Sequence, residues 1–318
     1  MTRTLDERDR AYQKALATLE KQAVAEYLTY MPYRLEMEYD EAPPAPDWTF
    51  HTGLASSGTT GIVKLANGHP DCLVLHEGLI WLYTDILGTP QFRPTPRSNA
   101  INHSRMLWHA GFKQWPASRV RAFFEGVRQM VAPDAHLFGD KATLYARELN
   151  DIQAVFPGCK LVHSTRDTWD NVTSIYNAPW WRANVVRRDG ELPSEDSLAL
   201  EAHDHVVGWL QQIAGHKRIM ADPQKENAFL VSFEDLAEKP RETVEGLLDF
   251  LELDAAEYDW SALDTVHFAG RVGTWKDAPA IVKLKEELEN GQGRDSKRVR
   301  KSQGAPVATR GRRRAARK

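Results

Sequence analysis

Short apolar runs and amphipathic segments alternate through the middle of the chain. Runs rich in β-branched and aromatic residues predict strands, while apolar residues spaced three and four apart predict helices. The segments with the strand pattern are 48–52, 72–75, 136–138, 160–164 and 228–233. The segments with the helix pattern are 59–67, 117–131, 143–156, a stretch from about 170, 197–214 and 240–251.

This alternation predicts an α/β fold. Strands that are joined through helices form βαβ units, so we expect a central, mainly parallel sheet flanked by helices. Ligands of such sheets bind at the carboxyl ends of the strands. Three parts follow along the chain: a helix with a Pro-rich linker at 1–46, an α/β domain at 47–290 and a tail at 291–318. A polar stretch with four prolines, 89–116, is a candidate loop or lid on the substrate side.

Composition indicates the class of protein and the compartment in which it resides. The chain has 318 residues and 42% hydrophobic residues, which suits a globular domain with a sizeable core. Its apolar runs are too short to span a bilayer, and its first residues lack the apolar core of a signal peptide. Cys72 and Cys159 lack metal-ligand spacing and predict buried thiols in a reducing compartment. We therefore expect a cytoplasmic protein.

The net charge of −3 conceals an uneven distribution. Residues 291–318 contain eleven Lys and Arg residues and one Asp, a charge of +10, which leaves −13 for the rest of the chain. The tail has few apolar residues, so the sequence predicts a disordered, solvated segment. The alternative is an electrostatic contact with nucleic acid or another polyanion.

The first candidate site follows strand 48–52. The spacing Gly53-x4-Gly58-x-Thr60 is close to a phosphate-binding P-loop, but Thr59 stands where the P-loop has lysine. Backbone N–H groups from Ser57 to Thr60 could face an anion at the positive end of the next helix, and the hydroxyls there could add donors. The alternative is a tight strand–helix turn without a ligand. Without the lysine, the loop argues against an ordinary kinase or ATPase.

A second candidate anion site follows strand 160–164. Arg166 comes where a buried strand ends, and a guanidinium can hold a phosphate with two hydrogen bonds. Ser174, eight residues later on the next helix, can donate a hydroxyl to the same phosphate. The alternative is an Arg166 paired with Asp167 or Asp170. Two separated anion sites suit a ligand that carries two separated phosphate groups.

With these motifs the chain resembles the sulfotransferases that use 3′-phosphoadenosine 5′-phosphosulfate (PAPS). Four segments resemble family motifs and occur in the family's order: Ser57–Thr60 (5′-phosphosulfate loop), Arg166–Ser174 (3′-phosphate motif), Phe233–Leu236 followed by Pro240, and the Gly-x-x-Gly-x-Trp segment Gly270–Trp275. The resemblance implies a P-loop-like sulfotransferase fold, PAPS as sulfuryl donor, no metal, and a small-molecule or glycan acceptor.

The resemblance also implies site residues. The cofactor-binding set is Ser56, Ser57, Gly58, Thr59, Thr60, Arg166, Ser174, Arg271, Gly273 and Trp275. Two positions depart from the family pattern. Ser56 stands where the family usually has Arg or Lys, and Phe268-Ala269 stand where it has Arg-Lys, a loss for which Arg271 would compensate.

The candidate catalytic residues lie at strand ends. Glu77 follows strand 72–75 and is the expected base, with the adjacent His76 as second choice. Their alternative roles are a carboxylate at a helix start and a packed histidine. Lys141 is expected to stabilise the leaving oxygen and to offset the missing cation at Ser56, unless it only pairs with Asp140. Lys64 is the weaker substitute, because it lies over a turn inside its helix.

Two other functions remain open from the sequence. One is a small-molecule kinase of the P-loop type, which the missing lysine disfavours. The other is a non-catalytic nucleotide-binding protein that has lost turnover through Ser56 and uses its basic tail to bind a polyanion.

Overall fold

The computed structural model describes residues 44–76, 121, 125, 128, 132–143 and 145–290. Five sequence expectations fall wholly or mostly outside these residues: the N-terminal helix with most of its linker, Glu77, the candidate lid 89–116, the helix 117–131 and the tail 291–318. Within the described part of the chain, no helix combines the length and the apolar character needed to cross a membrane. Cys72 and Cys159 are buried free thiols, as expected.

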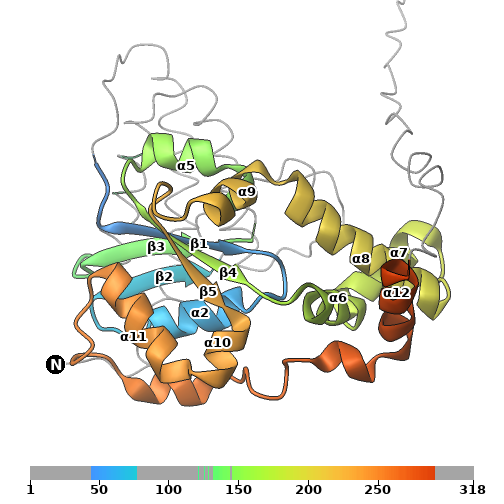
Figure 1. Ribbon diagram of the computed structural model, residues 1–318. Helices are drawn as coiled ribbons and strands as arrows, with labels where there is room; N and C mark the ends of the chain where they lie inside the picture. The colour runs from blue at the N-terminus through green and yellow to red at the C-terminus, as the bar shows by residue number, and fades with distance from the viewer. Residues whose placement is uncertain are drawn as a thin grey trace, which may run out of the picture.

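Five strands form one sheet in which every pairing is parallel. Their order across the sheet is β2-β3-β1-β4-β5 (Figure 1). The strands are β1 (Trp48–Gly53), β2 (Cys72–His76), β3 (Leu137–Lys141), β4 (Lys160–Thr165) and β5 (Ala228–Ser232). Each contains or overlaps a segment that the hydrophobic pattern marked as a strand. The expected α/β fold with a parallel sheet is therefore confirmed.

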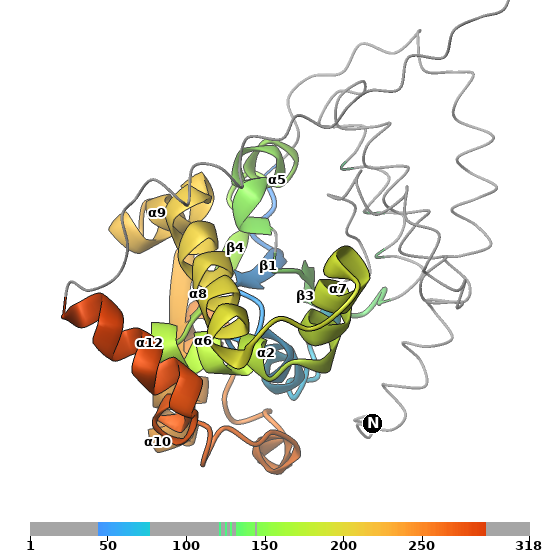
Figure 2. The same cartoon turned by 90° about the vertical axis from the view of Figure 1, so that its right-hand side faces the viewer.

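Helices cover both faces of the sheet and the region beyond its carboxyl edge. The first group, below the sheet in Figure 1, is α2 (Thr59–Ala66), α10 (Phe233–Glu238) and α11 (Pro240–Leu251). The opposite face carries α5 (Leu149–Val155) and α9 (Ala214–Ala221), and the 3₁₀ turn η2 (Tyr145–Arg147) contacts both of these helices. Beyond the edge lie α6 (Thr168–Tyr176), α7 (Pro179–Asp189), α8 (Glu195–Gln212) and α12 (Pro279–Glu289). Figure 2 shows α8 and α12 beside α6, and two further 3₁₀ turns are η3 (Trp260–Thr265) and η4 (Thr274–Asp277).

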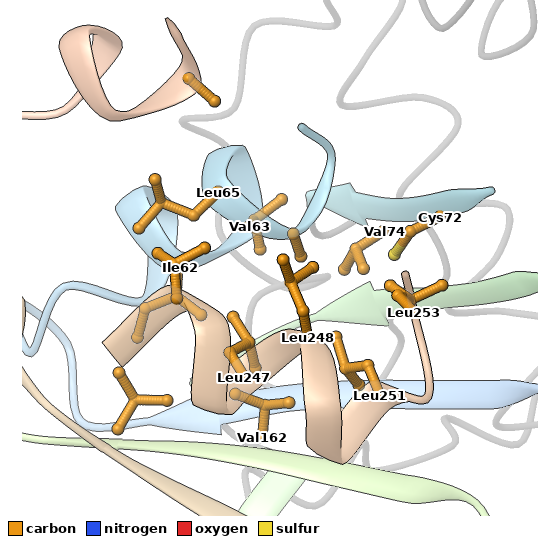
Figure 3. Packing of buried hydrophobic residues seen from close by; sticks show 14 of the residues in the cluster. Ile62, Val63, Leu65, Cys72, Val74, Val162, Leu247, Leu248, Leu251 and Leu253 are labelled. Atoms are coloured by element: carbon orange, nitrogen blue, oxygen red, sulfur yellow. The ribbon is translucent and has the colours of Figure 1, made fainter. Parts of the chain in front are cut away.

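Helix α2 is fixed to the sheet by a buried apolar cluster. Its residues Ile62, Val63 and Leu65 pack with leucines of α11 and with Val162 of β4 (Figure 3). Burying a side chain of this size contributes about 1.5–3 kcal/mol. The loop that precedes α2 is thus attached to an anchored helix, and a ligand at the helix start meets a preformed surface.

The expected helix at 143–156 is wrong in its first half. The structure has the 3₁₀ turn η2 there, and the α-helix begins only at Leu149. Two buried side-chain bonds hold this turn against the sheet. The Tyr145 hydroxyl donates to Asp140 Oδ2 at 2.6 Å, and the Ala146 N–H donates to Thr52 Oγ1 at 3.2 Å. These two bonds, one to the end of β3 and one to β1, outweigh the helical periodicity of the segment.

Candidate functional site

The glycine loop between β1 and α2 has the geometry of an anion-binding turn. Gly58 is the N-cap of α2 with φ of 88°, and Ser56 also has a positive φ, 68°. A Cβ atom on Gly53 would lie 2.0 Å from Ser164 Oγ on the neighbouring strand β4. The loop therefore depends on glycine at both places, at Gly58 for conformation and at Gly53 for close packing.

Ser57 supports this loop from the inside. Its N–H and its hydroxyl both donate to the Leu54 carbonyl, at 3.1 and 2.6 Å. Its Oγ also lies 2.6 Å from Ser164 Oγ, and the side chain is buried. The structure therefore turns the Ser57 hydroxyl away from the surface where the sequence would place an anion.

Helix α2 begins at Thr59, directly after the glycine loop. The first bond of this helix runs from the Ile62 N–H to the Gly58 carbonyl at 3.1 Å. N–H groups at the very start of a helix have no acceptor within it and form the positive end of its dipole. Such an end favours an anionic group.

One cleft, with a volume of about 380 Å³, joins the two candidate anion sites. Its lining includes Ser56, Gly58, Thr59, Thr60, Gly61, Lys64, Arg166, Ser174, Phe233, Thr265, Val266, His267, Phe268 and Arg271. Seven of the residues expected from the sequence are in this set. None of these described lining residues is an aspartate or a glutamate, whereas three carry a permanent positive charge. The cleft is therefore suited to a ligand with several negative charges.

Arg166 connects the two sides of the cleft. Its Nη1 donates to the Ser56 carbonyl at 2.9 Å and its Nη2 donates to the Arg271 carbonyl at 2.7 Å. The guanidinium carbon lies 4.1 Å from the centre of the Phe233 ring. Burial lowers the pKa of Arg166 and the nearby charge of Asp170 raises it. An arginine stays protonated under these conditions, so the group keeps its charge.

The carboxylates next to Arg166 are engaged elsewhere. Asp167 caps α6 by accepting the N–H groups of Trp169 and Asp170, each at 2.9 Å. Asp170 accepts from the Gly273 N–H at 2.6 Å, the Trp275 N–H at 3.2 Å and a threonine hydroxyl between them. Within the described residues, Arg166 forms no ion pair with either aspartate. The alternative in which Arg166 serves only such a pair is therefore not what the structure shows.

Gly273 and Trp275, which the sequence predicted to bind the cofactor, are not among the residues that line the cleft. Their N–H groups bind Asp170, and the Trp275 ring lies 5.0 Å from Lys285 Nζ. This arrangement ties the start of η4 to α6. The segment before it carries Arg271, which lines the cleft.

Lys141 is the last residue of β3, at the same edge of the sheet as the glycine loop. Its Cα pairs in register with His51 of β1 and with His76 of β2. Its side chain is 3% exposed and is not part of the cleft lining described above. The structure describes only the backbone of His76, and Glu77 lies outside the described residues. The sheet thus brings Lys141 and His76 to adjacent strand ends.

His51, the register partner of Lys141, is a buried histidine with a strongly shifted pKa. Within the described residues neither ring nitrogen has a hydrogen-bond partner. Burial, followed by the charge of Lys141, lowers the pKa of His51 to about 3. The ring is therefore neutral in the folded protein at pH 7.

Acidification is expected to destabilise the fold through His51. In the unfolded chain this histidine has a pKa of about 6.5, so below that pH the unfolded chain binds a proton that the folded protein does not. Stability present at pH 7 is lost as the pH falls, by about 2 kcal/mol between pH 7 and pH 5 from this group. Urea denaturation of the wild type and of His51→Gln measures this. The free energy of unfolding should fall less in the variant by that amount, and an equal fall in both proteins would contradict the assignment.

The sequence ranked Lys64 only as the weaker substitute cation, and it did not identify the segment 265–267 as part of the cleft. For Lys64 a signal exists, because residues four apart share a helix face and Thr60 was already a candidate. For Phe268 the signal is its place in the segment where the family has Arg-Lys, whereas for 265–267 no signal exists. Packing brings this segment to α2, where a Cβ on Gly61 would lie 2.5 Å from the Phe268 ring.

Several solved structures resemble this chain at low sequence identity. A sulfotransferase domain from the Synechococcus PCC 7002 olefin synthase is 16% identical, with a TM-score of 0.42 over 80% of this chain and 98% of that domain. Sulfotransferase STF9 from Mycobacterium avium is 17% identical, with a TM-score of 0.44 over 80% and 75% of the two chains. Mouse sulfotransferase SULT7A1 complexed with PAP is 14% identical, with a TM-score of 0.43 over 83% and 91%. No curated protein sequence matches.

A family model gives the decisive comparison. The model described as the sulfotransferase family matches residues 49–257, which is more than half of the chain. The matched region contains the glycine loop, Lys141, Arg166 and Ser174, and ends before Arg271. This chain belongs to the sulfotransferase family.

Proposed function

We propose that this protein transfers a sulfuryl group from PAPS to a hydroxyl or amine acceptor. The observation that carries the proposal is the single cleft lined by both the glycine loop and Arg166. The start of α2 would hold the 5′-phosphosulfate. Arg166, Ser174 and Arg271 would hold the 3′-phosphate.

The charges of the cleft support a nucleotide that binds without a metal. Lys64, Arg166 and Arg271 line it, and no carboxylate does so among the described residues. A kinase of the P-loop type holds Mg²⁺ with the P-loop Ser/Thr and an aspartate and places a lysine on the phosphates. The described lining of the cleft contains neither that aspartate nor the loop lysine.

Bound PAPS would supply the sulfuryl group, whose bond to the 5′-phosphate oxygen breaks as the bond to the acceptor oxygen or nitrogen forms. The start of α2 would stabilise the charge that is left on the 5′-phosphate, and Lys141 would do the same from β3. Glu77 would take the proton from the acceptor, with His76 as the second choice. The product on the donor side is adenosine 3′,5′-bisphosphate.

Calorimetry tests the nucleotide specificity directly. The wild type is expected to bind adenosine 3′,5′-bisphosphate without magnesium, about ten-fold or more tighter than AMP. The two ligands differ only in the 3′-phosphate, and one charged hydrogen bond is worth about 1.5–3 kcal/mol. A screen with ³⁵S-labelled PAPS over phenols, sugars and amines then tests transfer.

Each rival function has its own outcome in these experiments. Magnesium-dependent consumption of ATP would support the small-molecule kinase. Tight binding of the bisphosphate without transfer to any acceptor class would support a non-catalytic nucleotide-binding protein. A small-molecule or glycan acceptor, a cytoplasmic location and a polyanion contact of the tail 291–318 are further proposals. They rest on the sequence alone.

A further inference from the structure

The glycine loop lacks a cation of its own, and Lys64 is the lysine of the cleft lining. It lies on the exposed side of α2, whose opposite side is buried in the apolar cluster with α11. Within the described part of the chain no carboxylate forms an ion pair with it. Its ammonium is therefore available to a ligand in the cleft.

Helix geometry directs this ammonium toward the loop. Side chains on a helix lean toward its N-terminus, so Lys64 covers the turn formed by Thr60 and Gly61. Both of these residues line the cleft, and neither carries a long side chain. A lysine side chain spans about one helical turn, which brings its amine over the helix start where an anion would sit.

Lys141 is less well placed for the same task. It is 3% exposed at the end of β3, whereas Lys64 is exposed and lines the cleft. We propose that Lys64 is the cation that binds the 5′-phosphate end of the nucleotide, in place of the cation that the loop lacks at Ser56. This inference rests on the proposed function. It reverses the ranking of the two lysines that the sequence alone suggested.

A pair of ligands separates a contact at the 5′ end from a contact elsewhere. Calorimetry would compare adenosine 3′,5′-bisphosphate with adenosine 3′-monophosphate, which lacks only the 5′-phosphate. Lys64→Gln is expected to lower the affinity for the bisphosphate about ten-fold, the usual loss for one charged hydrogen bond, and to leave the affinity for the monophosphate unchanged. Lys64→Arg, which keeps the charge, should stay within about three-fold of the wild type.

Lys217→Gln is the matched control, because Lys217 is an exposed helical lysine on α9 that does not line the cleft. It should bind both ligands like the wild type. Thermal unfolding verifies that the variants are folded, since Lys64 also lies in the last turn of α2, where a cation favours the helix. Unchanged binding of the bisphosphate by Lys64→Gln would overturn the inference, as would an equal loss for both ligands. A wild type that binds no bisphosphate would instead overturn the proposed function itself, and the inference with it.

Discussion

Gly53→Ala is expected to lower the free energy of unfolding by about 3 kcal/mol or more. The new Cβ would lie 2.0 Å from Ser164 Oγ and 2.7 Å from the Ser164 carbonyl oxygen. That carbonyl belongs to β4, which is hydrogen-bonded to β1 and to β5, so it cannot move without disturbing the centre of the sheet. Overpacking costs about 1–3 kcal/mol, and the φ of 151° adds backbone strain of about 1–3 kcal/mol.

Gly190→Ala separates these two costs. Gly190 also has a positive φ, 88°, but at the end of α7 no atom lies within 4 Å of the place that a Cβ would take. The Gly190→Ala variant should lose only about 1 kcal/mol of unfolding free energy, the cost of the backbone strain without any clash. Urea denaturation of both variants gives the comparison. A loss in Gly53→Ala no larger than in Gly190→Ala would show that β4 accommodates the methyl group, and the close packing beneath the loop would be no constraint.

Strand positions were the part of this fold that the sequence predicted best. The segment 160–164, with Leu161 and Val162 at its centre, corresponds to the observed β4 (Lys160–Thr165), whose first five residues are buried because β4 is an interior strand of a parallel sheet. Helix boundaries were less predictable where a side chain bonds to a neighbouring strand instead of packing along the helix. Tyr145 fits a helical face by its spacing, yet its hydroxyl bond to Asp140 holds it in a 3₁₀ turn.

In the candidate site, too, the sequence predicted the backbone conformation better than the direction of the side chains. Glycine spacing identified a loop whose conformation needs glycine, because φ angles and close approaches restrict residue type directly. It could not show which way a hydroxyl points. Ser57 donates inward to Leu54, although its position in the motif favoured an anion. Nothing in the sequence indicates that Val266 and His267 line the cleft beside α2, because their place depends on packing between distant segments.

Arg166→Ala is expected to weaken the binding of adenosine 3′,5′-bisphosphate ten-fold or more, a loss of about 1.4 kcal/mol or above in binding free energy. The alanine removes the charge for the 3′-phosphate. It also removes the two bonds that join the Ser56 carbonyl to the Arg271 carbonyl across the cleft. Arg166→Lys retains the charge, but an ammonium lacks the planar fork that reaches two carbonyls and a phosphate together. We therefore expect the lysine to recover only part of the affinity.

Arg241→Ala is the matched control for this variant. The Arg241 guanidinium lies 4.1 Å from the Trp260 ring centre, the same stacking distance as Arg166 over Phe233, but Arg241 is not part of the cleft lining. The Arg241→Ala substitution should leave the affinity for adenosine 3′,5′-bisphosphate, measured by calorimetry, unchanged. Equal affinities in wild type and Arg166→Ala would remove Arg166 from the nucleotide site. A full recovery by Arg166→Lys would show that charge alone matters, and that the bridge between the phosphate loop and the Arg271 segment makes no contribution to binding.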